Sequence, residues 1–356
     1  MTKILAFLNA YTHGKSGGDV CFVEIYKRMP KFHLTVVTSK LGQKFCEENG
    51  LQAAYKITTK EKRFQNVLST YIRRIWGSFR IDAKISEMDA IYSTSDALPD
   101  TLSAWYFSVR YRKKWIATVF HIVSSDRFIS YVSQKISHFL IKHANIVIID
   151  NLLLRKELQK RGFDKKKIIL RYPGITVPQK IDAIGKNYDA ITVSRLHESK
   201  GIEDLITIWK QVVQTMPDKK LGIIGTGDHD YQRYLLTLIR QKKLEKSITF
   251  LGYLDEKKVF EHIKSADIFL FPSHEEGFGM AVGEALAIGT PVIAYDLPAY
   301  EHTFKKNMTT IPCFDKQRFA EKTIQQLHKK NPQEKNDIVK RFTWENAVHI
   351  EQTLYE

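Results

Sequence analysis

One stretch of the sequence combines carboxylates, glycines and an expected helix start, and together these could bind a phosphorylated sugar. It reads FPSHEEGFGMAVGEALAIGTPVIAYD over residues 271–296, with seven residues between Glu276 and Glu284. A strand should end at Pro272 and a helix should begin near Ala281, so backbone N–H groups would point at an anion. Carboxylates beside that anion would accept charge-assisted hydrogen bonds from hydroxyls, which are roughly twice as strong as neutral ones. The stretch predicts a site for a sugar or ribose next to phosphate.

The residues between the two glutamates complete this predicted site. Gly277 and Gly279 allow the backbone to approach a ligand, and the N–H groups of residues 278–281 lie at the helix start. Either glutamate alone would fit a helix cap or a surface position, so only the complete string favours binding. The expected binding residues in the stretch are Glu276, Gly277, Phe278, Gly279, Met280, Ala281 and Glu284.

A second group of residues could neutralise a diphosphate. The segment VSRLHESKGIEDLI covers residues 193–206, where Arg195 follows an expected strand and Lys200 precedes an expected helix. Two cations would offset two negative charges, and each close pair contributes on the order of 4 kcal/mol before desolvation at an effective dielectric constant near 20. A basic loop taken alone is more often solvated surface. His197 and His274 are taken as ordinary loop histidines.

The N-terminal segment NAYTHGKSGGDV, residues 9–20, contains a glycine-rich turn that invites comparison with nucleotide-triphosphate loops. Such a loop needs a glycine five residues before the glycine of its Gly-Lys-Ser end, and Asn9 stands there instead. Gly17 and Gly18 could still bring backbone close to an anion, with a helix beginning near Asp19. A plain surface turn is the alternative.

The elements that must position these residues alternate between short β-rich runs and helical patterns, which favours two doubly wound parallel-sheet domains with a cleft between them. In such sheets, ligands bind beyond the carboxyl ends of the strands. The segment PQKIDAIGKN, residues 178–187, is the expected linker. The expected domains are residues 1–178, residues 179–341 and a closing helix at residues 342–356. The expected strands lie near residues 4–8, 34–38, 91–93, 115–120, 146–150, 168–171, 191–194, 221–225, 248–251, 268–272 and 292–295.

The composition narrows the class of protein. The chain has 356 residues, 43% of them hydrophobic, and its apolar runs are only strand-sized. Neither a membrane span nor a cleavable signal is expected, and three widely spaced cysteines favour a reducing cytoplasm. The first 180 residues hold 31 Lys and Arg against 14 Asp and Glu, whereas the rest hold 24 against 25. The two domains are therefore expected to face different partners.

These motifs resemble the retaining glycosyltransferases of family four, which have the GT-B fold of two Rossmann-like domains facing a cleft. The resemblance covers most of the chain and is strongest over residues 191–296. Glu276 to Glu284 matches the family's E-x7-E signature, and Arg195 with Lys200 matches its diphosphate-binding pair. The remaining matches are the turn at Gly225, the nucleobase-facing stretch around Tyr253, the glycine pair Gly17 and Gly18, and His121 near the reacting sugar.

The resemblance implies an enzyme that transfers a sugar, expected to be a hexose, from a UDP- or GDP-sugar with retention of configuration. His121, Glu276, Arg195 and Lys200 would carry catalysis. Neither a cofactor nor a metal is expected, because Arg195 and Lys200 supply the positive charge. Asp228-His229-Asp230 has the form of a metal-binding D-x-D motif but is expected to cap a helix. The segment Arg171 to Val177 departs from the family pattern, and residues 40–89 carry no family motif, which leaves the acceptor open.

Residues 62–80 place apolar side chains at helical spacing among five basic residues and no acid. A basic amphipathic helix can lie on an anionic membrane, although its apolar stripe could equally pack into the domain core. Residues 105–115 again mix aromatic and basic types. A peripheral enzyme on the inner face of the membrane, acting on a lipid-linked or other glycan acceptor, is therefore expected. The alternatives are a sugar-nucleotide-binding protein or epimerase of the same fold and, more remotely, a nucleic-acid-binding protein.

Overall fold

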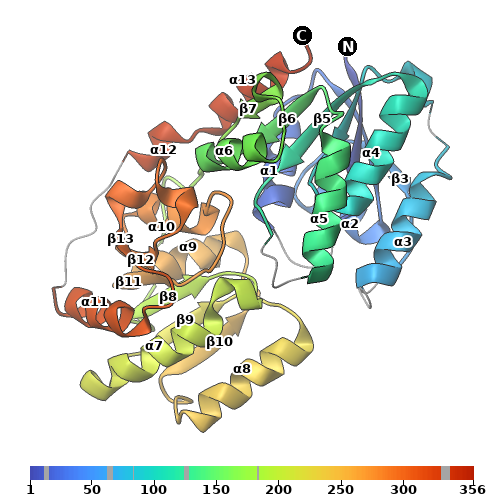
Figure 1. Cartoon of the computed structure of the whole chain (residues 1–356). Coiled ribbons are helices and arrows are strands. Elements are labelled where there is room, and N and C mark those ends of the chain that lie inside the picture. Colours follow the sequence, from blue (N-terminus) through green and yellow to red (C-terminus); the bar gives the residue numbers. More distant parts are fainter. Residues whose placement is uncertain (12–15, 62–66, 83, 124–127, 183, 330–336) are drawn as a thin grey trace. The chain divides into compact units, whose positions relative to one another are not determined.

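The computed structural model describes residues 1–11, 16–61, 67–82, 84–123, 128–182, 184–329 and 337–356. Internal contacts divide the chain into two compact units. Unit 1 comprises Met1–Gly174 together with Trp344–Glu356, and unit 2 comprises Ile175–Thr343. Each unit is built on its own parallel sheet (Figure 1).

Unit 1 contains a seven-stranded parallel sheet in the order β3-β2-β1-β4-β5-β6-β7. Its central strands are continuous apolar runs because helices cover both faces of a parallel sheet. The strands are β1 (Lys3–Leu8), β2 (His33–Thr38), β3 (Ala54–Ile57), β4 (Ala90–Ser93), β5 (Lys114–Val119), β6 (Ile146–Ile149) and β7 (Ile168–Leu170). The helices are α1 (Gly17–Tyr26), α2 (Lys40–Glu48), α3 (Val67–Ser78), α4 (Leu98–Tyr111), α5 (Phe128–Ile141), α6 (Leu152–Lys160) and α13 (Trp344–Thr353), with short 3-10 turns η1 (Ile85–Glu87) and η2 (Lys165–Lys167).

Unit 2 contains a six-stranded parallel sheet in the order β10-β9-β8-β11-β12-β13. The strands are β8 (Ala190–Val193), β9 (Leu221–Ile224), β10 (Ile248–Gly252), β11 (Ile268–Phe271), β12 (Val292–Tyr295) and β13 (Thr309–Ile311). The helices are α7 (Ile202–Thr215), α8 (His229–Gln241), α9 (Glu256–Ser265), α10 (Met280–Ile288), α11 (Lys316–Lys329) and α12 (Ile338–Arg341), with 3-10 turns η3 (Glu198–Lys200), η4 (Pro298–Tyr300) and η5 (Lys305–Asn307).

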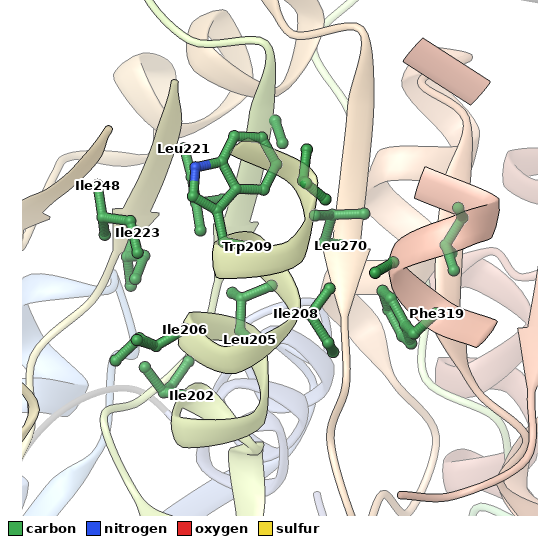
Figure 2. Packing of buried hydrophobic residues seen from close by; sticks show 14 of the residues in the cluster. Ile202, Leu205, Ile206, Ile208, Trp209, Leu221, Ile223, Ile248, Leu270 and Phe319 are labelled. Atoms are coloured by element: carbon green, nitrogen blue, oxygen red, sulfur yellow. The ribbon is translucent and has the colours of Figure 1, made fainter. Parts of the chain in front are cut away.

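The core of unit 2 lies between α7 and the sheet. Figure 2 shows Trp209 of α7 among aliphatic side chains of β9, β10 and β11, with Phe319 of α11 in the same cluster. Trp209 and Phe319 are fully buried. Burying a large apolar side chain stabilises a fold by roughly 1.5–3 kcal/mol. This packing fixes α7, whose first turn lies next to the candidate site.

Helix α13 belongs to unit 1, although it follows unit 2 in the sequence. The buried carboxylate of Glu351 forms an ion pair with Arg171, which follows β7, and accepts a hydrogen bond from the hydroxyl of Tyr26 at 2.7 Å. Trp344, at the start of the helix, packs against Gly174 so closely that a Cβ there would lie 2.5 Å from the indole ring. The end of the chain is thereby anchored to the first sheet.

All eleven expected strands are present, and β3 and β13 are additional. Both additional strands lie at a sheet edge and are short and partly exposed, so they lack the apolar run that marks a central strand. Helix α1 begins at Gly17 rather than near Asp19, because the Ser16 hydroxyl caps it by accepting the Asp19 N–H at 3.2 Å. Residues 12–15, which include Gly14 and Lys15 of the glycine-rich turn, lie outside the described residues.

Candidate functional site

Three loops meet at the carboxyl edge of the unit 2 sheet, after β8, β9 and β11. Gly201 has φ +63°, and a Cβ there would overlap the carbonyl oxygen of Pro272. Gly225 has φ +135°, and its Cβ would overlap the carbonyl oxygen of Ser194. Only glycine allows this backbone-to-backbone packing. The sequence motifs on the three loops are therefore held together.

The loops bring Lys200 and Glu276 into a direct ion pair. The Lys200 Nζ lies 2.6 Å from Glu276 Oε1, and the Ser273 hydroxyl donates a hydrogen bond to the same oxygen at 2.9 Å. The side chains of Lys200 and Glu276 are only 16% and 12% exposed. The sequence assigned the lysine to a diphosphate and the glutamate to sugar hydroxyls. In the free chain the two neutralise each other, which the sequence did not indicate.

Arg195 lies on the same edge, on a segment that continues β8. Its neighbours donate backbone hydrogen bonds to the strand alongside, from Ser194 to Ile224 at 3.0 Å and from Leu196 to Thr226 at 2.9 Å. The Arg195 side chain is exposed, and no carboxylate among the described residues forms an ion pair with it. A fixed backbone thus presents a guanidinium available to an anion.

A buried network behind the loops was missed from the sequence. The carboxylate of Asp204, in the first turn of α7, contacts His274 Nε2 at 3.0 Å, the Tyr295 hydroxyl at 3.0 Å and Lys316 Nζ at 2.8 Å. Burial alone would raise the pKa of Asp204, but these hydrogen bonds outweigh it and lower the pKa to about 2. His274 is therefore part of a structural network rather than an ordinary loop histidine. Only a packed structure shows this partnership, because its members are far apart in the sequence.

The loop after β11 ends at the N-terminus of α10. Gly279 is the N-cap at φ +90°, and Met280 and Ala281 begin the helix. Phe278 is buried and its ring packs on Phe304 and Phe342, so only its backbone could meet a ligand.

The other predicted donor-binding residues lie near this edge. Glu284 is one turn into α10 and partly exposed. Directly after β9, Gly225 donates its N–H to the carbonyl of Gly252, the last residue of β10. Tyr253 follows Gly252, and its side chain is 65% exposed. The α10 start and these positions stay predictions for ligand contact.

In unit 1 the predicted residues Gly18 and His121 lie at the carboxyl edge of the sheet. A Cβ on Gly18 would lie 2.6 Å from the ring of Phe120, so this glycine allows α1 to pack on the segment after β5. The partly exposed His121 follows directly, and its carbonyl accepts a hydrogen bond from Gln134 Nε2 at 2.8 Å. The roles of Gly17, Gly18 and His121 toward a sugar stay predictions.

Gln134 and its partners form a second cluster that the sequence did not reveal. The side-chain amide of Gln134 also accepts the Val123 N–H at 2.9 Å and donates to Asp96 at 2.8 Å. His138 Nε2 lies 3.1 Å from the same carboxylate oxygen of Asp96. Burial would raise the pKa of Asp96, but the interactions with His138, His121 and Gln134 together outweigh it and the pKa is lowered. This cluster fixes the backbone on both sides of Ile122 and so positions His121.

Comparison with known proteins agrees with this geometry. Residues 176–341 match the sequence family described as Glycosyl transferases group 1. The match covers nearly all of unit 2 and none of unit 1. WclY of Escherichia coli, an O-antigen biosynthesis glycosyltransferase, is 26% identical over 309 residues, or 82% of this chain and 78% of WclY. WcaL of Escherichia coli K12, a glycosyltransferase named for colanic acid biosynthesis, is 29% identical over 191 residues. That alignment spans 50% of this chain and about half of WcaL, 46%.

Solved structures confirm the predicted fold class of this chain. Anabaena HepE in complex with UDP and glucose aligns with a TM-score of 0.77 at 19% identity over 99% of each chain. A mutant of TarM from S. aureus, in complex with Fondaparinux, alpha-GlcNAc-glycerol and UDP, aligns with a TM-score of 0.75 at 13% identity over 100% of both chains. The chain therefore has the GT-B fold, with two parallel-sheet α/β domains.

The D-x-D motif caps a helix, as predicted. Asp228 Oδ1 accepts the N–H groups of Asp230 and Tyr231 at 2.9 and 3.2 Å at the start of α8, and Asp230 pairs with Arg233 at 2.8 Å. Within the part of the chain that is described, no group of three His, Cys, Asp or Glu side chains is arranged to hold a metal ion.

Unit 1 carries an exposed apolar face on α3, α4 and α5, which lie side by side (Figure 1). The three helices include one carboxylate among their described residues, Asp100, which is fully buried. No helix in the described ranges is long and apolar enough to cross a membrane. We name this surface the three-helix face; its exposed apolar side chains are Leu68, Ile72, Trp76, Phe79, Tyr106, Val109, Tyr111, Ile129, Val132, Ile136 and Phe139.

Proposed function

We propose that this chain transfers a sugar, expected to be a hexose, from a nucleotide-diphosphate sugar to an acceptor, with retention of configuration. The observation that carries the proposal is the Lys200–Glu276 pair at the sheet edge, with Arg195 on the same edge and the start of α10 at the end of the β11 loop. A phosphate group needs compensating positive charge, which the Arg195 guanidinium and the N–H groups at the start of α10 supply beside the Lys200 ammonium. HepE, which shares the fold, was solved with UDP and glucose.

Each predicted residue then has a role in the donor complex. Arg195, Lys200 and the N–H groups at Met280–Ala281 stabilise negative charge on the leaving diphosphate, a preorganised electrostatic effect. Glu276 accepts hydrogen bonds from sugar hydroxyls, and Glu284 does so from the ribose. The ion pair holds the Glu276 carboxylate in a defined position before the donor arrives.

Two further features follow from the family resemblance. His121 contacts the sugar near the anomeric carbon, from a backbone that Gln134 positions. Attack by the acceptor on the face that the diphosphate leaves accounts for retention. Backbone near Gly225 and Tyr253 contacts the base, which leaves UDP- and GDP-sugars as the donors to test.

The acceptor is proposed to be a glycan, lipid-linked or otherwise presented at an anionic membrane surface. The three-helix face supports this proposal, because apolar side chains and basic residues without exposed carboxylates suit the interface of an anionic bilayer. WclY is named for O-antigen biosynthesis and WcaL for colanic acid biosynthesis. On this proposal the enzyme acts at the inner face of the membrane.

A donor panel tests the transfer. The full chain is incubated with UDP- and GDP-sugars, and nucleoside diphosphate release is measured with and without membrane-derived glycan acceptors. Transfer predicts release that depends on the acceptor and a product that retains the anomeric configuration by NMR. Donor binding without release would favour the alternative of a sugar-nucleotide-binding protein, and a changed sugar on an intact donor would favour an epimerase.

Flotation with vesicles tests the membrane proposal. Phosphatidylcholine vesicles with phosphatidylglycerol should carry the protein at low salt and release much of it at high salt, because counter-ions screen the basic residues. Vesicles of phosphatidylcholine alone should bind weakly. Equal recovery with both vesicle types at every salt concentration would contradict an electrostatic contribution.

A further inference from the structure

A hollow of about 490 Å³ lies in unit 1, between the end of β3 and α3. Small-molecule sites commonly have volumes of about 300–1,000 Å³. The side chains that matter here are Arg73, Trp76 and Arg80. The hollow lies on the acceptor-binding unit, in the sequence region where no family motif was found.

Two arginines give the hollow positive charge. Among the described residues, the Arg73 guanidinium donates hydrogen bonds within its own helix, with Nε and Nη2 each 3.4 Å from oxygens of Ser69 and Thr70, which is near the outer limit of a hydrogen bond. Arg80 is exposed, and neither guanidinium forms an ion pair with a described carboxylate. Arginine presents a planar fork of donors that fits phosphate oxygens. The hollow is therefore suited to a phosphate-bearing group.

Close backbone packing and buried polar contacts hold helix α3, which lines the hollow, in a fixed position. Gly77 of α3 contacts the backbone of Thr58 so closely that a Cβ would overlap the Thr58 carbonyl. The neighbouring Arg74 is fully buried, pairs with Glu61 at 2.7 Å and donates to the carbonyl of Asn9 at 2.6 Å. These contacts fix α3 against the ends of β1 and β3. The exposed arginines beside Arg74 therefore project from a rigid base.

Trp76 belongs both to the hollow and to the three-helix face. Its indole is 61% exposed, and α3 also exposes Leu68 and Ile72. Trp and Tyr side chains are enriched at the level of lipid head groups. A ligand in the hollow would thus have its charged part beside arginines and its apolar part along the helix. A second copy of this chain fits poorly, since two cationic faces repel.

We propose that this hollow binds the phosphate or diphosphate head group of a lipid-borne acceptor, while the three-helix face rests on the bilayer. The proposal rests on the proposed function in that it identifies the acceptor class of the same reaction. Arg73 and Arg80 contact the phosphate oxygens, and Trp76 packs on the first apolar segment of the lipid. A nucleic acid or a soluble anionic glycan has no apolar segment that would contact the exposed apolar side chains of the adjoining helix α3.

Calorimetry with farnesyl diphosphate, below its micellar concentration, tests the site in the full chain. The wild-type protein should bind it at least about tenfold more tightly than inorganic pyrophosphate or farnesol, since charged and apolar contacts both contribute. The double variant Arg73→Gln with Arg80→Gln should lose at least about tenfold in affinity. The matched control, Arg110→Gln with Arg112→Gln, removes the same charge from exposed positions outside the hollow and should retain wild-type affinity.

The outcomes separate this inference from the transfer proposal. Binding of UDP-glucose by the hollow variant should equal that of the wild type, because Arg73 and Arg80 are not among the residues assigned to the donor, most of which lie in unit 2. Equal losses in both double variants would overturn the site, because net charge alone would explain binding. Equal affinity for pyrophosphate and farnesyl diphosphate would overturn the lipid assignment. Farnesyl diphosphate binding without any nucleotide-sugar binding would instead contradict the proposed donor.

Discussion

The two units share one architecture, yet their surfaces are equipped differently. In unit 2 the loops at the carboxyl edge pack backbone against backbone, and Lys200 is already paired with Glu276. In unit 1 the arginines of the hollow lack carboxylate partners among the described residues, and three adjacent helices expose apolar side chains. Eleven large apolar side chains are exposed on the three-helix face, against five among the described residues of unit 2.

This difference fits the partners proposed for the two units, a nucleotide-diphosphate sugar for unit 2 and an acceptor at a membrane surface for unit 1. A nucleotide-diphosphate sugar is small and rich in hydrogen-bonding groups, so a preorganised polar site binds it best. An acceptor at a membrane surface calls for a broad apolar and basic face. The following predictions alter one unit at a time, in order of decreasing effect.

Removal of the Glu276 carboxylate should have the largest effect. Glu276→Gln keeps the shape but loses the charge that pairs with Lys200 and that we propose binds sugar hydroxyls, so turnover should fall on the order of a hundredfold or more. The measurement is donor-dependent product formation at saturating donor. Glu275→Gln changes the adjacent carboxylate and serves as control, with activity near that of the wild type. Full activity of Glu276→Gln would break the assignment of the site.

Gly201→Ala should disrupt the loop packing of unit 2. The new Cβ overlaps the Pro272 carbonyl at a left-handed φ, which should cost about 2–3 kcal/mol of unfolding free energy and weaken donor binding. Gly252→Ala is the matched control, because Gly252 has φ +67° with no atom within 4 Å. Its cost should be about 1 kcal/mol, from backbone conformation alone. Equal losses in the two variants by urea denaturation would show that loop contact contributes nothing.

The Asp204 network should make unit 2 sensitive to acid. The pKa of the Asp204 carboxyl is about 2 in the folded chain against 3.8 for the unperturbed group, so the ionised form stabilises the fold. This contribution, about 2 kcal/mol, is fully present above about pH 4 and is lost as the pH falls toward 2. Urea denaturation at several pH values measures it. Asp204→Asn should flatten the dependence over this range, and an unchanged slope would assign the effect to other groups.

Single substitutions on the three-helix face should have the smallest effect. Ile72→Ser and Phe139→Ser each remove an exposed apolar side chain, worth roughly 1–2 kcal/mol at a membrane interface, so vesicle partitioning should fall several-fold. Leu236→Ser removes a comparably exposed side chain from unit 2 and should leave partitioning unchanged. Equal effects at all three positions would erase the contrast between the units.

The sequence was most informative where a structural element or a motif depends on residues that are close together in the chain. Short apolar runs that alternate with helical patterns predicted the central strands. The loop between β11 and α10 was recognisable from its glycines and glutamates. The edge strands β3 and β13 were missed, because short, exposed strands have no apolar run.

Long-range partnerships could not be predicted. The pairing of Lys200 with Glu276 joins residues 76 positions apart, and that of Asp204 with His274 joins residues 70 apart. The Gln134 amide that positions His121 is equally invisible in the sequence, because one glutamine on an amphipathic helix carries no motif. Such contacts depend on which strands become neighbours in the sheet.

Titration calorimetry of the full chain with UDP- and GDP-sugars tests the central claim most directly. We expect saturable heat of binding with one sugar nucleotide, at a stoichiometry of one. The affinity should fall at least about tenfold when Arg195 and Lys200 are both changed to Gln. Arg233→Gln, which alters an exposed arginine on α8, should bind like the wild type. Absence of heat from folded protein with every nucleotide sugar, or unchanged affinity in the Arg195 and Lys200 double variant, would contradict it.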